Sequence, residues 1–193
     1  TPDVMRALGN KVSARQMALD AGAPVMPATG VLPNEPEQIT QLAKDIGFPL
    51  MLKASWGGDG RGMRIIERVD DLIDQVQAGR REAENAFGNG EMYLEKLVRQ
   101  ARHVEVQLLG DKHGNIVHLW ERDCSVQRRN QKVVERAPAP YLNEAQRNEL
   151  CEAALRLAKK ANYVNAGTAE FLMDVDTGAF YFIEVNPRIQ VEH

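Results

Sequence analysis

The stretch "KASWGGDGRGMRI", residues 53–65, places four glycines within six positions between two apolar runs. These glycines are Gly57, Gly58, Gly60 and Gly62. Because glycine has no Cβ, its backbone can adopt positive φ and bring N–H groups close to an anion. The spacing differs from GxGxxG, since position 63 is methionine, and from GxxxxGKS/T. We interpret it as a strand-flanked flap suited to a phosphate, with Lys53 at its base; a mobile hairpin turn is the alternative.

The segments around this flap predict a small unit of mixed helix and strand. Residues 48–55, 62–68 and 91–98 have the apolar character of strands. Residues 34–49 and 70–87 have helical periodicity, and in the first of these Asn34 and Glu37 have capping-box spacing while Gly47 is a stop signal. We therefore expect a compact α+β unit over residues 25–97.

The second half of the chain predicts two hairpins separated by a helix. Residues 102–127 form two alternating runs joined by "DKHGN", and residues 166–190 form two more joined by "DVDTG". The helix between them begins at Asn143, with Gln146 at capping-box spacing. At the start of the chain, Asp3 and Ser13 are candidate caps of two short helical segments.

Composition excludes several classes of protein. The chain has 193 residues, 44% hydrophobic and 26% charged, with net charge −3, so no overall field favours nucleic acid or an anionic membrane. No apolar run reaches the ~20 residues of a membrane span. Cys124 and Cys151 form no CxxC pair, which favours a reducing, cytoplasmic-type compartment. We expect a piece of a longer protein, because the chain starts at Thr1 and stops at "RIQVEH".

The last hairpin carries a candidate metal site. Glu170 and Glu184 lie on opposite arms, and if the register pairs them, two like charges stand about 5 Å apart unless a cation shares the site. Such oxygen ligands suit magnesium. A one-residue slip in register would instead place the two glutamates on opposite faces.

Polar residues at a spacing of two follow this hairpin. Asn186, Arg188, Gln190 and Glu192 would share one face of an extended chain, where an arginine fork could bind an oxyanion and a carboxylate could take a proton. A surface strand with its polar side exposed is the alternative. The basic cluster "QRRNQK", residues 127–132, lacks aromatic interleaving, so phosphate contact fits better than nucleic acid.

Five stretches, in this order along the chain, resemble the ATP-grasp region of the biotin carboxylase family. They are "KASWGGDGRGMRI", "YLEKLV..ARHVEVQLLGD", "ERDCSVQRRNQKVVERAPAPYL", "NAGTAEFL" and "FYFIEVNPRIQVEH". The resemblance covers nearly the whole chain. Within the family, "QRRNQKVVERAPAPYL" is most similar to the biotin carboxylase domain of pyruvate carboxylases.

The resemblance implies an α+β ATP-grasp fold, truncated at both ends, in which two subdomains hold ATP and the glycine loop is a lid. Residues 1–24 would be a helical lead-in from a preceding domain, residues 25–97 the lid subdomain, and residues 98–193 an incomplete C-terminal subdomain. The lid must fold over the triphosphate and open again, and glycines keep both states accessible.

The resemblance also implies roles for individual residues. The ATP-binding set is Lys11, Lys53, Gly57, Gly58, Gly60, Gly62, Met63, Glu95, Lys96, Val98, His103, Gln127 and Asn130. The magnesium ligands are Glu170, Glu184 and Asn186. The bicarbonate-binding set is Lys132, Arg188, Gln190, Val191 and Glu192. Of these, Lys132, Arg188 and Glu192 are catalytic, with Glu192 as the base.

The implied reaction uses Mg-ATP, with Mn²⁺ as an alternative metal, to phosphorylate bicarbonate to carboxyphosphate, which releases CO₂ for attack by N1 of biotin. Biotin would arrive on a carrier domain absent from this chain. The other expected partners are flanking domains of the same polypeptide, in a homo-oligomer that binds neither nucleic acid nor membrane, located in the cytoplasm or the mitochondrial matrix.

Two departures from the family pattern bear on these roles. Trp56 and Asp59 stand where many relatives have glycine, and Asn130 stands where some have histidine. Two other functions stay open: a different ATP-grasp ligase such as a carbamoyl phosphate synthetase, and a nucleotide-binding fragment without catalysis. The fragment alone is not expected to be fully active.

Overall fold

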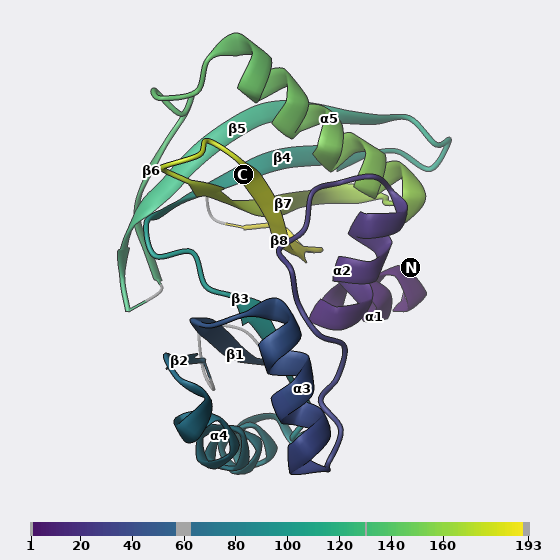
Figure 1. Cartoon of the computed structure of the whole chain (residues 1–193). Coiled ribbons are helices and arrows are strands. Elements are labelled where there is room, and N and C mark those ends of the chain that lie inside the picture. Colours follow the sequence, from purple (N-terminus) through teal and green to yellow (C-terminus); the bar gives the residue numbers. More distant parts are fainter. Residues whose placement is uncertain (1, 57–62, 130, 191–193) are drawn as a thin grey trace. The chain divides into compact units, whose positions relative to one another are not determined.

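The computed structural model describes residues 2–56, 63–129 and 131–190. The chain divides into two compact units, Met26–Arg99 and Thr1–Val25 with Gln100–His193 (Figure 1). The helices at the start of the chain thus cluster with its second half. None of the helices in the described ranges is long and apolar enough to cross a membrane.

The unit Met26–Arg99 consists of a three-stranded antiparallel sheet with two helices. Its elements are α3 (Pro36–Ile46), β1 (Leu50–Ala54), β2 (Arg64–Ile66), the 3-10 turn η1 (Val69–Asp71), α4 (Leu72–Phe87) and β3 (Met92–Lys96). The strand order is β2-β1-β3. β1 and β2 pair antiparallel from Leu50–Ile66 to Leu52–Arg64, so the prediction that strands flank the glycine-rich stretch is confirmed.

The start of α3 differs from the prediction. Its N-cap is Glu35, which makes no side-chain cap bond, and Pro36 occupies the first helical turn. Proline fixes the φ of that turn, so the helix begins after Asn34 and the predicted capping box does not form. The Asn34 side chain instead accepts a hydrogen bond from Arg80 at 3.1 Å. The predicted stop is confirmed, because Gly47 ends the helix with φ of 84°.

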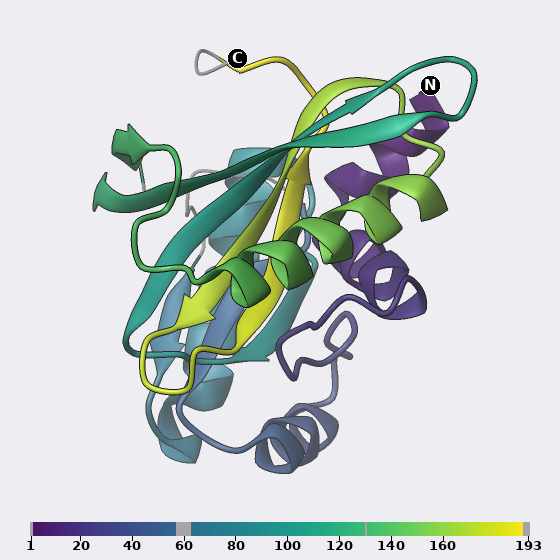
Figure 2. The ribbon, with the colours of Figure 1, turned by 90° about the horizontal axis from the view of Figure 1, so that it is seen from above.

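The other unit is built on a five-stranded antiparallel sheet. Its elements are α1 (Pro2–Gly9), α2 (Lys11–Asp20), β4 (Ala101–Gly110), β5 (Ile116–Arg128), β6 (Gln131–Arg136), α5 (Glu144–Lys160), β7 (Asn165–Asp174) and β8 (Phe180–Asn186). The strand order is β6-β5-β4-β7-β8, with both predicted hairpins present. The helices cover one face, with α5 lying across β4 and β5 and with α1 and α2 beside β8 (Figures 1 and 2).

Two caps in this unit show where local sequence decides a helix start. The predicted capping box of α5 is confirmed: the Asn143 side chain accepts from the Gln146 N–H, and the Gln146 side chain accepts from the Asn143 N–H. The predicted cap at Ser13 is wrong, because α2 begins earlier and its N-cap is Asn10, whose side chain accepts from the Ser13 N–H at 2.9 Å. Strand β6 was not predicted, because its start falls in the basic cluster.

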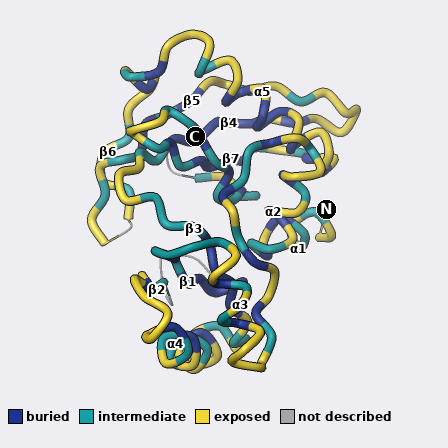
Figure 3. The backbone as a smooth tube through the Cα atoms, viewed as in Figure 1, coloured by how far each residue is buried: buried dark blue, intermediate teal, exposed yellow. Residues whose placement is uncertain are grey.

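The core of this unit lies between the sheet and its helices, where Figure 3 shows buried residues along β4, β7 and α5. Tyr163 sits at one end of this core with 4% of its surface exposed, and its hydroxyl donates to the Ala166 carbonyl at 2.9 Å. A Cβ added to Gly110 would lie 2.4 Å from the Tyr163 carbonyl oxygen, and one added to Gly167 would lie 2.2 Å from the Tyr163 hydroxyl. Both positions therefore require glycine for lack of space.

Replacing Gly167 with alanine should destabilise this unit by about 1–3 kcal/mol, because a buried tyrosine has no free direction in which to move. The measurement is the urea midpoint followed by circular dichroism. Gly9→Ala is the control, since nothing lies within 4 Å of its added Cβ; alanine in this helix should be neutral or stabilising. Equal midpoints for Gly167→Ala and the parent would contradict the prediction.

Candidate functional site

The candidate site lies on the face of the five-stranded sheet that the helices leave uncovered. Along β4, Val104 and Val106 belong to the hydrophobic core beneath the helices. Successive side chains of a strand point to opposite faces, so His103, Glu105 and Gln107 point away from that core. One face of the sheet therefore carries these polar side chains, and the opposite face packs against the apolar core.

Three carboxylates lie in a row across this face. Glu105 of β4 is the register partner of Glu170 in β7, and Glu170 is the partner of Glu184 in β8. The register that the sequence left open therefore places Glu170 opposite Glu184. Like charges in this position repel unless cations or N–H donors share the space.

Lys132 joins two of these carboxylates. Its Nζ contacts a carboxylate oxygen of Glu105 and lies 2.8 Å from Oε1 of Glu170. Burial lowers the pKa of Lys132, but the charge of Glu170 and the bonds to both glutamates outweigh burial and raise the pKa well above its ordinary value. The ammonium is therefore held in its charged form. Glu105, whose side chain is fully buried, also contacts Arg122 at 2.6 Å.

Glu170 has donors on both of its oxygens. Oε1 accepts from Asn186 Nδ2 at 2.7 Å and from Lys132, and Oε2 lies 2.8 Å from His103 Nε2. Burial raises the pKa of this carboxyl, but the hydrogen bond from His103 and the charge of Lys132 outweigh burial and lower it to about 2. Glu170 is therefore ionised throughout the neutral range.

The contacts of His103 define its tautomer. The Gln127 Nε2 atom lies 2.8 Å from the Cys124 carbonyl oxygen and 2.7 Å from His103 Nδ1. A carbonyl oxygen only accepts, so the Gln127 atom is the amide nitrogen and donates to Nδ1. The ring proton is then on Nε2, from which it is donated to Glu170. Gln127 thereby orients the histidine toward the carboxylate row.

The third carboxylate has a weaker internal partner. Lys11, the first residue of α2, places its Nζ 3.5 Å from Oε2 of Glu184. Glu184, Glu170 and Asn186 together offer carboxylate and amide oxygens, which are ligands that Mg²⁺ prefers. Asn186 donates to Glu170 in this structure, and rotating its amide would present the oxygen instead. The three residues thus fit the predicted magnesium site.

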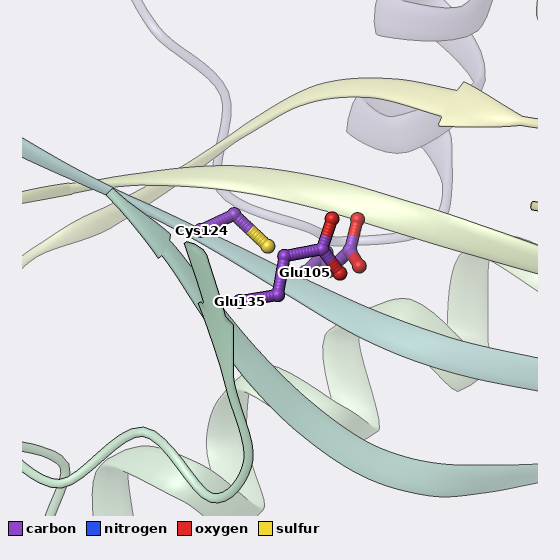
Figure 4. Close-up of side chains that lie close together, drawn as sticks. All are labelled: Glu105, Cys124 and Glu135. Atoms are coloured by element: carbon purple, nitrogen blue, oxygen red, sulfur yellow. The ribbon is translucent and has the colours of Figure 1, made fainter. Parts of the chain in front are cut away.

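Figure 4 shows a second cluster on β4, β5 and β6, made by Glu105, Cys124 and Glu135. Their potential ligand atoms lie within 4.8 Å of one another. Burial and the charge of Glu105 raise the pKa of the Cys124 thiol, so it stays protonated. Glu105 already contacts Arg122 and Lys132. These cations supply the balancing charge, so we assign no metal here.

The predicted ATP-binding residues of the unit Met26–Arg99 include one buried ion pair. Lys53 Nζ contacts a carboxylate oxygen of Glu95, and both side chains are 9% exposed. Lys96 donates to the carbonyl oxygens of Gly47 at 2.8 Å and Phe48 at 3.0 Å. Lys53 therefore already has a carboxylate partner within its own unit.

The remaining predicted residues make fewer contacts. β8 ends at Asn186, so strand alternation does not extend to Arg188 and Gln190. Arg188 is exposed and donates to the Ile189 carbonyl at 3.3 Å, while Gln190 accepts from Thr168 at 2.6 Å. Two others are half-buried, Met63 and Val98. The predicted residues outside the described ranges are Gly57, Gly58, Gly60, Gly62, Asn130, Val191 and Glu192, together with the departure at Asp59.

Sequence reasoning missed Glu105 and Arg122. Both lie on strands, where charged residues are usually solvated, so neither was selected. The available signal was the alternation of His103, Glu105 and Gln107 with the apolar residues of β4, because this places three polar side chains on one face. The burial of Glu105 depends on residues of β5, β6 and β7, and the local pattern of β4 does not reveal these partners.

Comparisons with known proteins agree on one family. Residues 10–193 match the model described as carbamoyl-phosphate synthase L chain, ATP binding domain. Pyruvate carboxylase 1 of Caenorhabditis elegans is 52% identical over 193 residues, which is 100% of this chain and 16% of that protein. Pyruvate carboxylase of Bacillus subtilis (strain 168) is 52% identical over 185 residues, 96% of this chain and 16% of the relative. The chain thus spans about a sixth of these relatives.

Solved structures give the same result. Rhizobium etli pyruvate carboxylase T882A, solved with the allosteric activator acetyl coenzyme A, has a TM-score of 0.93 and 64% identity, covering 99% of this chain and 17% of that one. A biotin carboxylase–β,γ-ATP complex from Campylobacter jejuni has a TM-score of 0.94 and 48% identity, covering 98% and 42%. A third structure is the biotin carboxylase domain of 2-oxoglutarate carboxylase from Hydrogenobacter thermophilus, solved with MgADP, ADP and bicarbonate. It has a TM-score of 0.93 and 44% identity, covering 99% of this chain and 42% of that one. The predicted α+β ATP-grasp fold is confirmed.

Replacing Glu170 with glutamine should change how stability depends on pH. The folded-state pKa of Glu170 is lowered from 4.5 to about 2, so its contribution of about 3 kcal/mol is present above pH 4.5 and is lost as pH falls toward 2. Urea unfolding of the parent and Glu170→Gln should therefore differ by about that amount at pH 7 and converge near pH 2. A gap that stays constant from pH 7 to pH 2 would refute the assignment.

Proposed function

Because the chain belongs to the family of carbamoyl-phosphate synthase L chain ATP-binding domains, we propose that it is the ATP-binding core of a biotin carboxylase within a pyruvate carboxylase. The observation that carries the proposal is the carboxylate row, in which Glu170 faces Glu184 with Asn186 and Lys132 in contact. The relatives are pyruvate carboxylases, and a similar structure is a biotin carboxylase with a bound ATP analogue. In this reading the chain uses Mg-ATP to phosphorylate bicarbonate.

The carboxylate row would hold the metal that accompanies the nucleotide. Glu170, Glu184 and Asn186 supply the oxygens, and a bound Mg²⁺ would neutralise charge on the phosphates. Glu170 needs no deprotonation, since its pKa is about 2. His103 and Gln127 would contact the ribose from the same face, and Lys11 would lie near the nucleotide. Mn²⁺ is an alternative metal.

Lys132 would bind the bicarbonate anion together with Arg188, Gln190, Val191 and Glu192. Its ammonium is held charged by Glu105 and Glu170, and an oxyanion would replace one of these two contacts. Glu192 would take the bicarbonate proton. The resulting oxyanion would then attack the γ-phosphorus, and the bond between that phosphorus and ADP would break. The protein's main work is then to position reactants and to neutralise charge, as phosphoryl transfer requires.

The other unit would hold the rest of the nucleotide. Glu95, Lys96 and Val98 would contact the adenine, and the glycines with Met63 would close on the phosphates. Lys53 would contact the phosphates as well, which requires it to exchange Glu95 for a phosphate oxygen.

The wider setting is also a proposal. Carboxyphosphate would release CO₂ to biotin carried on a domain outside this chain, and flanking domains of a longer, homo-oligomeric polypeptide would complete the enzyme. Relatives include a mitochondrial pyruvate carboxylase and bacterial ones, so we place the protein in the mitochondrial matrix or the cytoplasm. The second candidate is a carbamoyl phosphate synthetase, which the description of the family model favours. ATP cleavage that requires bicarbonate but is unaffected by biotin would support this second candidate.

Removing the Lys53 ammonium should weaken Mg-ATP binding by roughly 1.5–3 kcal/mol, about 10- to 150-fold in Kd, as expected for a charge-assisted hydrogen bond. Calorimetric titration of the parent and Lys53→Met measures this, after circular dichroism has shown that both are folded. Lys44→Met, an exposed lysine of α3 in the same unit, is the control and should keep the parental Kd. Equal affinity of the Lys53 variant and the parent would remove Lys53 from the nucleotide site.

Substituting the proposed base should separate chemistry from binding. In the complete enzyme, Glu192→Gln should lower the rate of bicarbonate-dependent ATP cleavage by about 10²- to 10⁴-fold, the usual range for a general base. ATP affinity should stay close to the parental value, because Glu192 is assigned to bicarbonate. Unchanged turnover in this variant would show that another group takes the proton.

A further inference from the structure

A cavity of about 450 Å³ lies outside all the residues assigned to nucleotide, metal or bicarbonate. It lies between β5, the segment after β6 and α5, all within one unit. Its lining residues are Leu119, Trp120, Glu121, Ala137, Pro138 and Arg147. Small-molecule sites have volumes of about 300–1,000 Å³ and combine apolar walls with a few polar groups, and this cavity has both properties.

A β-bulge forms one wall of the cavity. Glu121 pairs with Val106 and His118 pairs with Leu108, so Leu119 and Trp120 together oppose a single residue of β4. Trp120 has φ of 66°, a left-handed conformation that large side chains rarely adopt. Strained residues and bulges concentrate at binding sites, where they re-aim a side chain. Here they leave Leu119 57% exposed and Trp120 53% exposed.

Glu121 provides an unsatisfied acceptor beside this wall. Its Oε1 accepts from Arg147 Nε at 2.8 Å and from the Ala139 N–H at 3.0 Å. Its Oε2 is buried and has no hydrogen-bond partner among the described residues, and the side chain is 0% exposed. A buried carboxylate oxygen without a donor is costly, so a group that brings one would bind favourably. Arg147 already balances the charge, which favours a neutral donor over a second cation.

We propose that this cavity is a binding site for a small, planar, largely apolar molecule with a neutral N–H donor, of the class of the aromatic carboxamides. The ring would lie against Leu119 and Trp120, and the amide N–H would reach Oε2 of Glu121. Oε2 is sealed from solvent, so atoms of the cavity wall must shift before the ligand reaches it. Trp120 lines the cavity and would contact the bound ring. Trp120 is thus both a wall of the site and its reporter.

The test is an NMR titration that follows the indole N–H signals of the chain's two tryptophans, Trp56 and Trp120. Benzamide is the probe, methyl benzoate is the same ring without a donor, and benzoate is its anion. Benzamide should shift the Trp120 signal saturably with a Kd of about 1–10 mM, as expected for a fragment of this size. Methyl benzoate should bind about 5- to 10-fold more weakly, because it cannot donate the hydrogen bond. Benzoate should bind more weakly still, because its negative charge would approach the carboxylate of Glu121. Trp56, in the other unit, is the internal control.

Matched variants complete the test. Leu119→Ala should weaken benzamide binding several-fold. Val117→Ala, which changes a similarly exposed apolar residue of β5 that does not line the cavity, should leave the Kd unchanged. Neither change removes a buried group, so both variants should fold. An unshifted Trp120 signal, equal affinity for benzamide and methyl benzoate, or equal loss in both variants would overturn the proposal.

Discussion

The need to hold three carboxylates side by side on one face of an antiparallel sheet governs this structure. Glu105, Glu170 and Glu184 are register partners across β4, β7 and β8. Their repulsion is offset by Lys132, which contacts two of the three, with further donors from neighbouring strands. A buried ion pair adds little net stability, but removing one partner leaves an uncompensated buried charge. The sheet order and the charges of the site are therefore mutually dependent.

The same arrangement recurs in the second unit, where the Lys53 ammonium is matched by the buried Glu95. In both units, the cation that we assign to an anionic ligand already has a carboxylate partner. Under our proposal, ligand binding exchanges one ionic partner for another. The carboxylate partner holds each lysine side chain in place before the ligand arrives. This lowers the conformational entropy that the long side chain loses on binding.

The sequence was informative where structure depends on neighbours along the chain. The strands around the glycine-rich stretch and the capping box at Asn143 follow from local spacing, and both are present. The register of Glu170 with Glu184 could not be predicted, because the pairing of β7 with β8 shifts between Glu170 and Phe171, and local spacing does not reveal such an irregularity. Glu105 was missed because its partners come from other strands. Ser13 was misassigned because Asn10, three residues earlier, satisfies the same helix end.

The burial of the carboxylate row has a consequence for ionic strength. At physiological salt, charges in solvent are screened beyond about 8 Å, whereas buried pairs are screened much less. The Arg6–Asp3 pair of α1 has side chains that are 70% and 88% exposed, whereas those of Lys132 and Glu105 are 17% and 0% exposed. Added salt therefore weakens the outer ion pairs of the chain first and leaves the pairs of the sheet face almost unchanged. Varying the salt concentration thus separates the electrostatics of the surface from those of the site.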